Sequence, residues 1–304
     1  MISYVKDCLH EYKAIRRQRK SFKVISKYID SRENVFYLER EAIGDVVWQF
    51  WESPKVKSRA GNELVVGCLE SIEQCLWEGF ERKLLTLKSS LKYIQFPEFV
   101  YDKLQRGAPG FGLAAFSDIL RLALLCKYGG IWVDATILAL RPLGNIYLCN
   151  GDGAGFSFGR SNLEPFQVRK EWRRYDSCYF SWSMFSRVKW LNSFIVAGEK
   201  RDVLYEVLRI LLLIWKCEDR YPHYFTTQIV YEVLTRERGL EGFMMKSDVP
   251  VHYLQRCLNE MYDERVADEI EDKYPLQKMN WKIRDSEIVV GDTFFNRFFG
   301  AQRC

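Results

Sequence analysis

The segment KYGGIWVDATILALRPL, residues 127–143, carries a single carboxylate within a short apolar run. That carboxylate is Asp134, and Thr136 follows two positions later. In a strand these two side chains lie on the same side, because side-chain direction repeats every second residue. A carboxylate and a hydroxyl at the end of a strand suit a hard divalent cation that carries a diphosphate. The alternative is a turn aspartate that bonds its own backbone, and the spacing alone favours neither interpretation.

A second candidate pair lies in the preceding segment, LAAFSDILRLALLCKY, residues 113–128. Asp118 and Arg121 are three residues apart and share one face of a helix. Because this helix is apolar on almost every side, we expect it to be buried. A buried carboxylate and guanidinium are costly unless they pair or meet a ligand. Taken alone, such a pair is more often a structural ion pair than a functional one.

A glycine pair and a strand are expected to position Asp134. The helix over 113–128 is predicted to end at Gly129-Gly130, since glycine adopts the left-handed conformation without strain. IWVDATILAL, residues 131–140, is predicted to be a strand because it is rich in β-branched and aromatic residues. Ligands of open α/β sheets bind beyond the carboxyl ends of strands, so Asp134 is expected at a binding site.

Strands alternate with helices along the rest of the chain. Strands are predicted at 45–50, 82–89 and 175–186, and helices at 63–80, 199–217 and 223–238. This alternation implies an α/β sandwich with a mostly parallel sheet. We expect residues 1–40 to form a basic helical extension and residues 41–304 to form one domain with a large core.

Composition excludes several classes of protein. The net charge of +5 over 304 residues is mild and does not suggest a nucleic-acid partner. Nine cysteines, without a C-x-x-C pair, fit reduced thiols in the cytoplasm better than a disulfide framework. The first residues lack the apolar core of a signal peptide, and the longest apolar run, at 210–215, is too short to span a bilayer. A soluble cytoplasmic protein is therefore expected, at most peripheral on a membrane.

The segment KAIRRQRKSFK, residues 13–23, holds six positive charges and no negative one. One interpretation is the solvated face of a helix. The other is a helix that rests on anionic lipid headgroups, where each Lys or Arg adds about 1 kcal/mol.

Residues 113–143 resemble the core of the capsular polysaccharide synthesis glycosyltransferases, relatives of the DXD-type sugar-transfer enzymes and the glucosylating toxins. The shared pattern is S-D-x-x-R, then Y-G-G, then an aromatic-rich strand and D-A-T. VVWQFW at 46–51, DVPVHYLQ at 248–255 and GDTFFNRFF at 291–299 are similar to further motifs of that family. The resemblance runs from about residue 44 to the end and leaves the first forty residues uncovered.

The resemblance implies a GT-A (Rossmann-like) fold, with a mixed, mostly parallel sheet flanked by helices. It implies retaining transfer from a nucleotide-diphosphate sugar, with a UDP-hexose as the donor. Trp48 and Gln49 would hold the nucleoside base. Ser117, Asp118 and Arg121 would bind the donor sugar, and Asp118 and Arg121 would also place its anomeric carbon.

The resemblance also implies a dependence on Mn²⁺ or Mg²⁺. Asp134 would contact the ribose or the metal, and Thr136 stands where many relatives have a second aspartate. His252 would touch the diphosphate or the metal, although a loop histidine bonded to backbone is the commoner case. A hydroxyl is a weaker metal ligand than a carboxylate, so metal affinity is expected to be lower than in D-x-D relatives.

The function expected from these residues is the addition of a sugar to a bacterial capsule or surface polysaccharide. The resemblance implies a glycan acceptor on a lipid carrier at the inner face of the cell membrane, and residues 13–23 are its direct support. A first alternative is a glycosyltransferase that acts on protein side chains. A second is a non-catalytic module that binds nucleotide sugars or glycans and has lost the metal. Thr136, in place of a second aspartate, leaves this alternative open.

Overall fold

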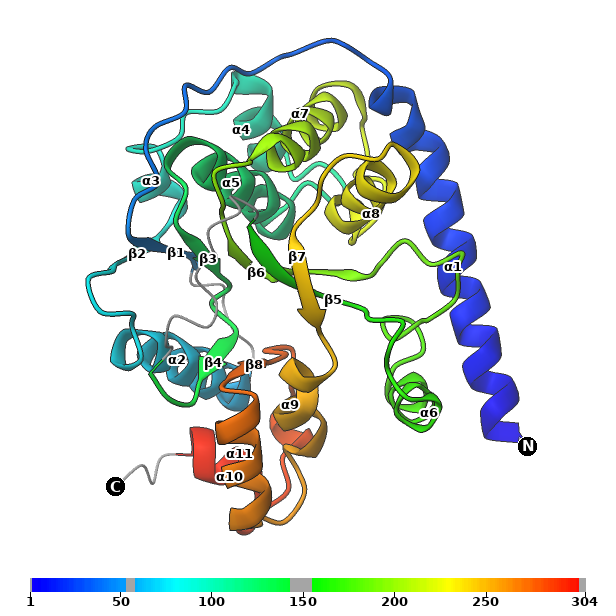
Figure 1. The fold of residues 1–304 in the computed structure, drawn as a ribbon, viewed down its shortest axis with the longest axis vertical. Coiled ribbons are helices and arrows are strands. Elements are labelled where there is room, and N and C mark those ends of the chain that lie inside the picture. The colour runs from blue at the N-terminus through cyan, green and yellow to red at the C-terminus, as the bar shows by residue number, and fades with distance from the viewer. Residues whose placement is uncertain (1, 53–57, 143–154, 301–304) are drawn as a thin grey trace.

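The computed structural model describes residues 2–52, 58–142 and 155–300. Its described part contains a six-stranded sheet in the order β2-β1-β3-β6-β5-β7 (Figure 1). The strands are β1 (Val46–Phe50), β2 (Glu81–Leu85), β3 (Ile131–Val133), β5 (Phe156–Gly159), β6 (Trp190–Val196) and β7 (Met244–Ser247). The pairs β1–β2, β1–β3 and β5–β7 are parallel, and β6 runs antiparallel to β3 and β5. This is the mixed, mostly parallel sheet predicted for a GT-A-like α/β fold.

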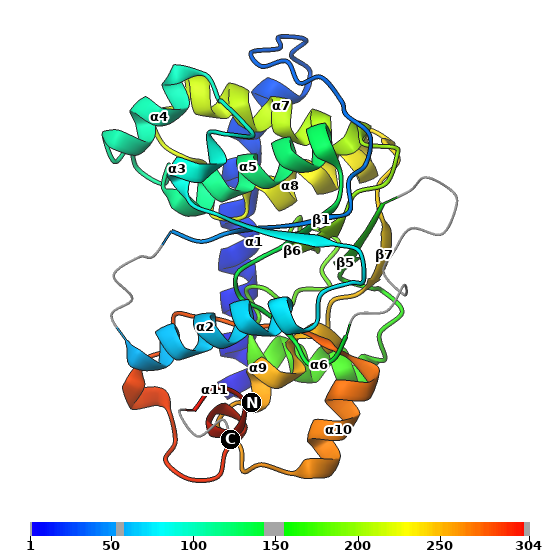
Figure 2. The same ribbon diagram turned by 90° about the vertical axis from the view of Figure 1, so that its left-hand side faces the viewer.

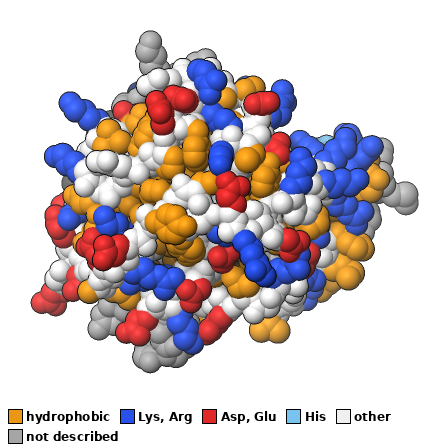
Figure 3. Space-filling model, turned by 90° about the horizontal axis from the view of Figure 1, so that it is seen from above, with side chains coloured by type: hydrophobic (Ala, Val, Ile, Leu, Met, Phe, Trp, Pro, Cys, Tyr) orange, Lys and Arg blue, Asp and Glu red, His pale blue; other side chains and the backbone are white. Residues whose placement is uncertain are grey.

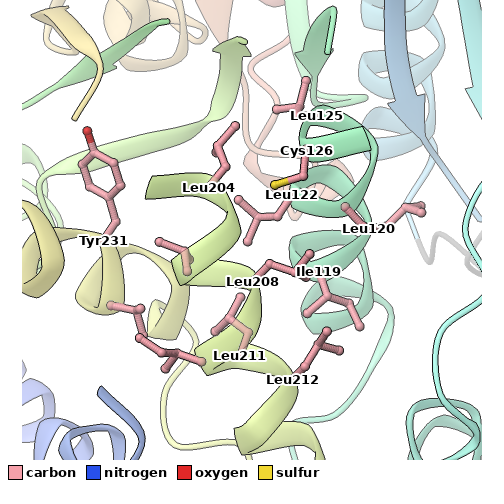
Figure 4. Close-up of a cluster of buried hydrophobic side chains, with 14 of the residues drawn as sticks. Ile119, Leu120, Leu122, Leu125, Cys126, Leu204, Leu208, Leu211, Leu212 and Tyr231 are labelled. Carbon is pink, nitrogen blue, oxygen red and sulfur yellow. The ribbon is translucent and has the colours of Figure 1, made fainter. Parts of the chain in front are cut away.

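Helices cover both faces of the sheet (Figure 2). One face carries α3 (Leu87–Ser90), α4 (Glu98–Gln105), α5 (Leu113–Tyr128), α7 (Asp202–Cys217) and α8 (Thr226–Glu232). The other face carries α2 (Arg59–Gln74), α9 (Tyr253–Cys257), α10 (Glu264–Lys273) and α11 (Phe294–Phe299). The largest apolar cluster lies between α5 and α7, where leucines such as Leu122 and Leu208 face one another (Figure 4). Both helices are therefore anchored by burial of their apolar faces.

The corner between α5 and β3 is built on two glycines. Helix α5 has the predicted bounds, and Gly129 and Gly130 follow it with φ of +67° and +80°. A Cβ on Gly130 would lie 2.4 Å from the carbonyl oxygen of Val46 in β1. Only glycine permits this approach, so the corner holds the C-terminus of α5 against the centre of the sheet.

The single strand predicted over 131–140 is wrong. The chain forms β3 in the main sheet, turns, and then forms β4 (Ile137–Ala139), which pairs antiparallel with β8 (Leu276–Lys278) in a second sheet. The turn is closed by Ile137, whose backbone N–H donates to the carbonyl of Asp134 at 3.0 Å. Asp134 therefore lies where the chain leaves one sheet for the other.

Other predicted elements differ in extent or in kind. The helix predicted at 63–80 is α2, which begins and ends earlier, and the strand predicted at 82–89 ends at Leu85. The helix predicted at 223–238 is α8 followed by a π-helix, Val233–Glu237. No strand forms over 175–186, because the Asp176 carboxylate accepts hydrogen bonds from the backbone of Cys178 and Tyr179 and folds the chain into turns.

Residues 2–29 form one long helix, α1 (Ile2–Ile29), along one side of the molecule (Figure 1). It packs against α6 (Phe166–Tyr175), α7 and α8. Gln18 and Ser21 lie on its buried face, where Gln18 accepts from the backbone of Arg187 at 2.8 Å and Ser21 donates to the carbonyl of Pro222 at 2.9 Å. The opposite face is solvent-exposed and basic, with Lys13, Arg16, Arg17, Arg19, Lys20 and Lys23. Within the described ranges, no helix is long and apolar enough to cross a membrane.

Candidate functional site

A cavity of about 550 Å³ opens at the carboxyl ends of β1 and β3. This is the edge at which open α/β sheets bind their ligands. Its polar lining comes from distant parts of the chain and includes Ser117, Asp118, Arg121, Asp134, Thr136, Asn192, His252 and Lys278. Six of the predicted site residues are thus brought to one cavity.

Asp118 lies on α5 with both carboxylate oxygens in use. One oxygen accepts from the hydroxyl of Thr227 on α8 at 2.8 Å, and the other accepts from the amide of Asn192 on β6 at 3.2 Å. Arg121 forms an ion pair with the same carboxylate at 3.1 Å. Burial raises the pKa of Asp118, and Arg121 offsets this only in part. The carboxylate is therefore fixed in orientation at the cavity wall.

Arg121 joins the two carboxylates of the site. Its side chain is 6% exposed, and its Nη2 lies 3.1 Å from Asp118 and 3.4 Å from Asp134. The same guanidinium bonds the hydroxyl of Ser117 at 3.3 Å and lies over the ring of Trp132 at 5.0 Å. The pair is therefore a buried ion pair that also lines the cavity, and its part in binding a ligand stays a prediction.

Asp134 follows β3 directly and is held from several sides. Its backbone N–H donates to the carbonyl of Ser193 at 2.8 Å, and the indole N–H of Trp132 donates to its Oδ1 at 2.8 Å. Burial raises the pKa of Asp134, but Arg121 and Lys278 together outweigh burial, so the net pKa is lowered. Asp134 is consequently an anion at neutral pH, fixed at the cavity wall with 22% of its side chain exposed.

Lys278 is a site residue that the sequence did not reveal. It ends β8, and its Nζ lies 3.2 Å from Oδ2 of Asp134 and also donates to the hydroxyl of Thr136. More than 140 residues separate it from these partners, so no local pattern indicates the contact. Asn192 and Thr227, which orient Asp118, were missed for the same reason. Trp132 could have been found, because it lies two positions before Asp134 and so points to the same side.

The predicted divalent-metal site does not fit this donor set. Of the three predicted ligands, Asp134, Thr136 and His252, only Asp134 carries a carboxylate, and an ammonium already bridges Asp134 and Thr136. Among the residues that the structure describes, no three His, Cys, Asp or Glu side chains gather where they could hold a metal. A divalent cation there would be repelled by Arg121 and Lys278, which already flank the carboxylate of Asp134.

His252 reaches the cavity from the segment before α9. Its ring packs against Trp172, Tyr179 and Phe180. Burial lowers its pKa to about 3, so the imidazole is neutral at pH 7. Its Nε2 is buried and has no hydrogen-bond partner within the described residues, so it is available to a ligand group.

Trp48 and Gln49 do not line the cavity. Trp48 is 1% exposed and donates its indole N–H to the carbonyl of Gly129 at 3.0 Å. Gln49 is fully buried and accepts from Arg82 at 2.6 Å. Tyr93 and Tyr128 pack against the ring of Trp48, and both side chains of this pair are buried, so direct contact of the pair with a nucleoside base does not fit. Instead, Phe50, Trp51 and Glu52 line this end of the cavity.

Comparison with known proteins identifies one family, and two glycosyltransferases are among the solved structures that match. A family model described as "Capsular polysaccharide synthesis protein" matches residues 5–298, which includes the N-terminal helix that the resemblance had left uncovered. A glycosyltransferase involved in glycosylation of the major capsid of PBCV-1 is 9% identical, with 80% of this chain and 95% of that chain covered at a TM-score of 0.39. The PaToxG glycosyltransferase is 12% identical, with 77% and 80% covered at a TM-score of 0.37. No curated protein matches.

Proposed function

Because this chain belongs to the capsular polysaccharide synthesis family of glycosyltransferases, we propose that its cavity binds a nucleotide-diphosphate sugar and transfers the sugar to a glycan. The observation that carries this proposal is the linked set of Asp118, Arg121, Asp134 and Lys278 at the wall of one cavity. Fixed carboxylates suit sugar hydroxyls, and fixed cations suit a diphosphate. We infer a UDP-hexose as the donor.

Aromatic side chains that also line the cavity fit the planar nucleoside base of the donor. Trp51 and Trp281 both line the cavity and meet edge to face, with ring centroids 5.8 Å apart. Phe50 lies beside them. We assign the nucleoside base to this aromatic end, in place of Trp48 and Gln49, since aromatic rings bind bases by stacking.

Retention at the anomeric carbon is supported by the state of Asp118 and Asp134, two of the acidic side chains that line the cavity. Arg121 contacts both Asp118 and Asp134, and each carboxylate accepts at least one further hydrogen bond. Neither is therefore a free general base for the acceptor hydroxyl. A retaining transfer needs no strong base, because the departing phosphate can take the acceptor's proton.

A lipid-linked acceptor at a membrane surface is supported by the basic face of α1. Lys and Arg side chains gather along the edge of the molecule on the side of α1 (Figure 3). Leu9 and Tyr12 are exposed beside them, at 47% and 61%. A helix with exposed cations and a few exposed apolar groups fits an anionic lipid surface. We propose that this face places the enzyme at the inner surface of the cell membrane.

A UDP-sugar panel tests the proposed activity. The full chain is incubated with UDP-glucose, UDP-galactose and their N-acetylated forms, with and without Mn²⁺, and the release of UDP is measured. We expect turnover of at least one donor and a loss of 100-fold or more in Asp134→Ala. Lys273→Met, an exposed substitution on α10, is the control and should keep full activity. Binding without turnover would favour the non-catalytic module instead, and transfer to a protein acceptor would favour the other enzymatic alternative.

A further inference from the structure

We propose that the ammonium group of Lys278 takes the place of a divalent cation at the diphosphate of the donor. This inference rests on the proposed function and names the group that stabilises its leaving phosphate. It starts from the finding that Lys278 bridges Asp134 and Thr136, the two residues expected to hold the metal.

The backbone fixes the position of Lys278. In the β4–β8 ladder its Cα lies opposite Ile137, and the backbone N–H of Met279 donates to the carbonyl of Thr136 at 2.8 Å. The preceding residue, Gln277, is fully buried and bonds Pro250, Tyr274 and Leu254. The strand can therefore not slide, and its last side chain is aimed at the turn that follows β3.

The ammonium retains capacity for a ligand. A lysine has three N–H donors, and within the described residues the acceptors of this one are Asp134 and Thr136. Lys278 lines the cavity, and its side chain is 21% exposed. The third donor is thus available to an anionic oxygen in the cavity. Lys282, four residues further on, also lines the cavity and adds a further cation to it.

The arrangement gives Asp134 a different role from the one expected. Its Oδ1 accepts from Trp132 and faces Arg121, and its Oδ2 faces Lys278. Asp134 therefore positions a resident cation instead of coordinating a metal. The ammonium of Lys278 is held by a carboxylate and a hydroxyl and is therefore preorganised. Preorganisation is the property that makes electrostatic stabilisation effective.

The chemical step balances with this group in place. The bond between the anomeric carbon and the β-phosphate oxygen breaks, and its electron pair goes to that oxygen. The acceptor hydroxyl forms the new bond to the anomeric carbon on the same face, and its proton passes to the departing phosphate. Lys278 keeps its own protons and donates a hydrogen bond to the oxygen that becomes negative.

Binding of UDP and of uridine to the full chain tests the inference without any need for an acceptor. Affinities are measured by calorimetry in EDTA and again in Mn²⁺, for the native chain, Lys278→Met, Lys278→Arg and the control Lys273→Met. Uridine lacks the diphosphate, so it reports the integrity of the cavity. Thermal unfolding of each variant reports whether it folds.

We expect the native chain to bind UDP in EDTA, with a change of less than twofold on adding Mn²⁺. Lys278→Met should weaken UDP binding about tenfold or more while leaving uridine binding unchanged, and Lys278→Arg should restore most of the loss. UDP binding that needs Mn²⁺ in the native chain, or that is unchanged in Lys278→Met, would overturn this inference alone. Failure of the native chain to bind UDP in either buffer would overturn the proposed UDP-sugar donor as well.

Discussion

The guanidinium of Arg121 lies 3.4 Å from the carboxylate of Asp134, and this contact joins helix α5 to the turn between the two sheets. Thirteen positions separate the two residues in sequence, and the glycine corner brings them together. The same guanidinium holds Asp118 at 3.1 Å. Burial raises the pKa of Asp118, whereas Arg121 and Lys278 lower that of Asp134 in spite of its burial. One arginine thus contacts two carboxylates whose pKa values are shifted in opposite directions.

Replacement of Arg121 by methionine should destabilise the fold strongly. The change leaves Asp118 buried with no counter-ion and removes one of the two cations at Asp134. Breaking a buried ion pair from one side costs about 3–5 kcal/mol, so we expect a loss in the free energy of unfolding of that order. Urea denaturation at pH 7 measures it. Arg59→Met, which removes an exposed partner of Glu63, should change stability by less than about 0.5 kcal/mol. A loss below about 1 kcal/mol for Arg121→Met would show that Asp118 does not depend on this arginine.

Substitution of Gly130 by alanine should disrupt the corner between α5 and β3. The residue has a φ of +80°, and the new methyl group would lie 2.4 Å from the carbonyl of Val46. Gly239 provides a matched control, because its φ is +71° and a methyl group added there would meet nothing within 4 Å. Gly239→Ala should cost about 1 kcal/mol from backbone strain alone, and Gly130→Ala considerably more. Thermal unfolding of the two variants measures the difference, and equal melting temperatures would refute the steric argument.

The sequence predicted the structure correctly where residues close together in the chain determine it. A long apolar run that ends at a glycine pair predicts a helix over 113–128, and α5 has the same bounds. The six predicted residues from Ser117 to His252 that line the cavity belong to a motif or to its flanking segments. The sequence thus identified part of the cavity lining, although it did not indicate Lys278.

Sequence failed where distant segments decide the structure. The run at 131–140 is largely apolar and β-branched, but its second half pairs with β8, about 140 residues later. That pairing splits one expected strand into two and brings Lys278 to Asp134. At Trp48 the motif suggested a base-binding residue, but the rings of Tyr93 and Tyr128 pack against it and it is buried. Neither outcome can be read from residues close in the chain.

Acid should weaken the fold through His252. Burial lowers its pKa to about 3, against an ordinary value of 6.5; Asp248 opposes this shift, and Arg160 and Lys278 add to it. Between these two values the unfolded chain binds a proton that the folded chain does not, so stability falls as pH falls. The neutral imidazole contributes to the free energy of unfolding, and this contribution is fully present above pH 6.5. It falls by at most about 1.4 kcal/mol per pH unit as the pH is lowered towards 3.

His252→Phe keeps a ring among the surrounding aromatic residues and removes the titration. We expect the stability advantage of the native chain over this variant to shrink by about 2 kcal/mol between pH 7 and pH 4.5, as measured by urea denaturation at several pH values. His10→Gln, at an exposed position, should follow the native curve. Parallel curves for the native chain and His252→Phe would contradict a neutral buried imidazole.

Charge removal on α1 should release the chain from anionic lipid. Deletion of the helix is a poor test, because its buried face packs against α7 and α8 and the deletion would expose their apolar side chains. Arg16→Gln, Arg17→Gln and Lys20→Gln together alter only exposed positions. Each cation contributes about 1 kcal/mol at an anionic surface, so the triple variant should bind vesicles of phosphatidylglycerol about a hundredfold more weakly.

Vesicle sedimentation at low and at physiological salt measures this binding, and the affinity of the native chain should fall as salt rises. Three exposed cations on other elements, at Arg265, Lys273 and Lys88, provide a control variant of equal net charge when changed to glutamine. The control should bind vesicles within a few-fold of the native chain. Equal loss in both variants would indicate a general charge effect. No loss of vesicle binding in the α1 variant would remove the support for a membrane-bound acceptor. The UDP-sugar turnover of the α1 variant should be unchanged in either case, since α1 contributes no residue to the cavity.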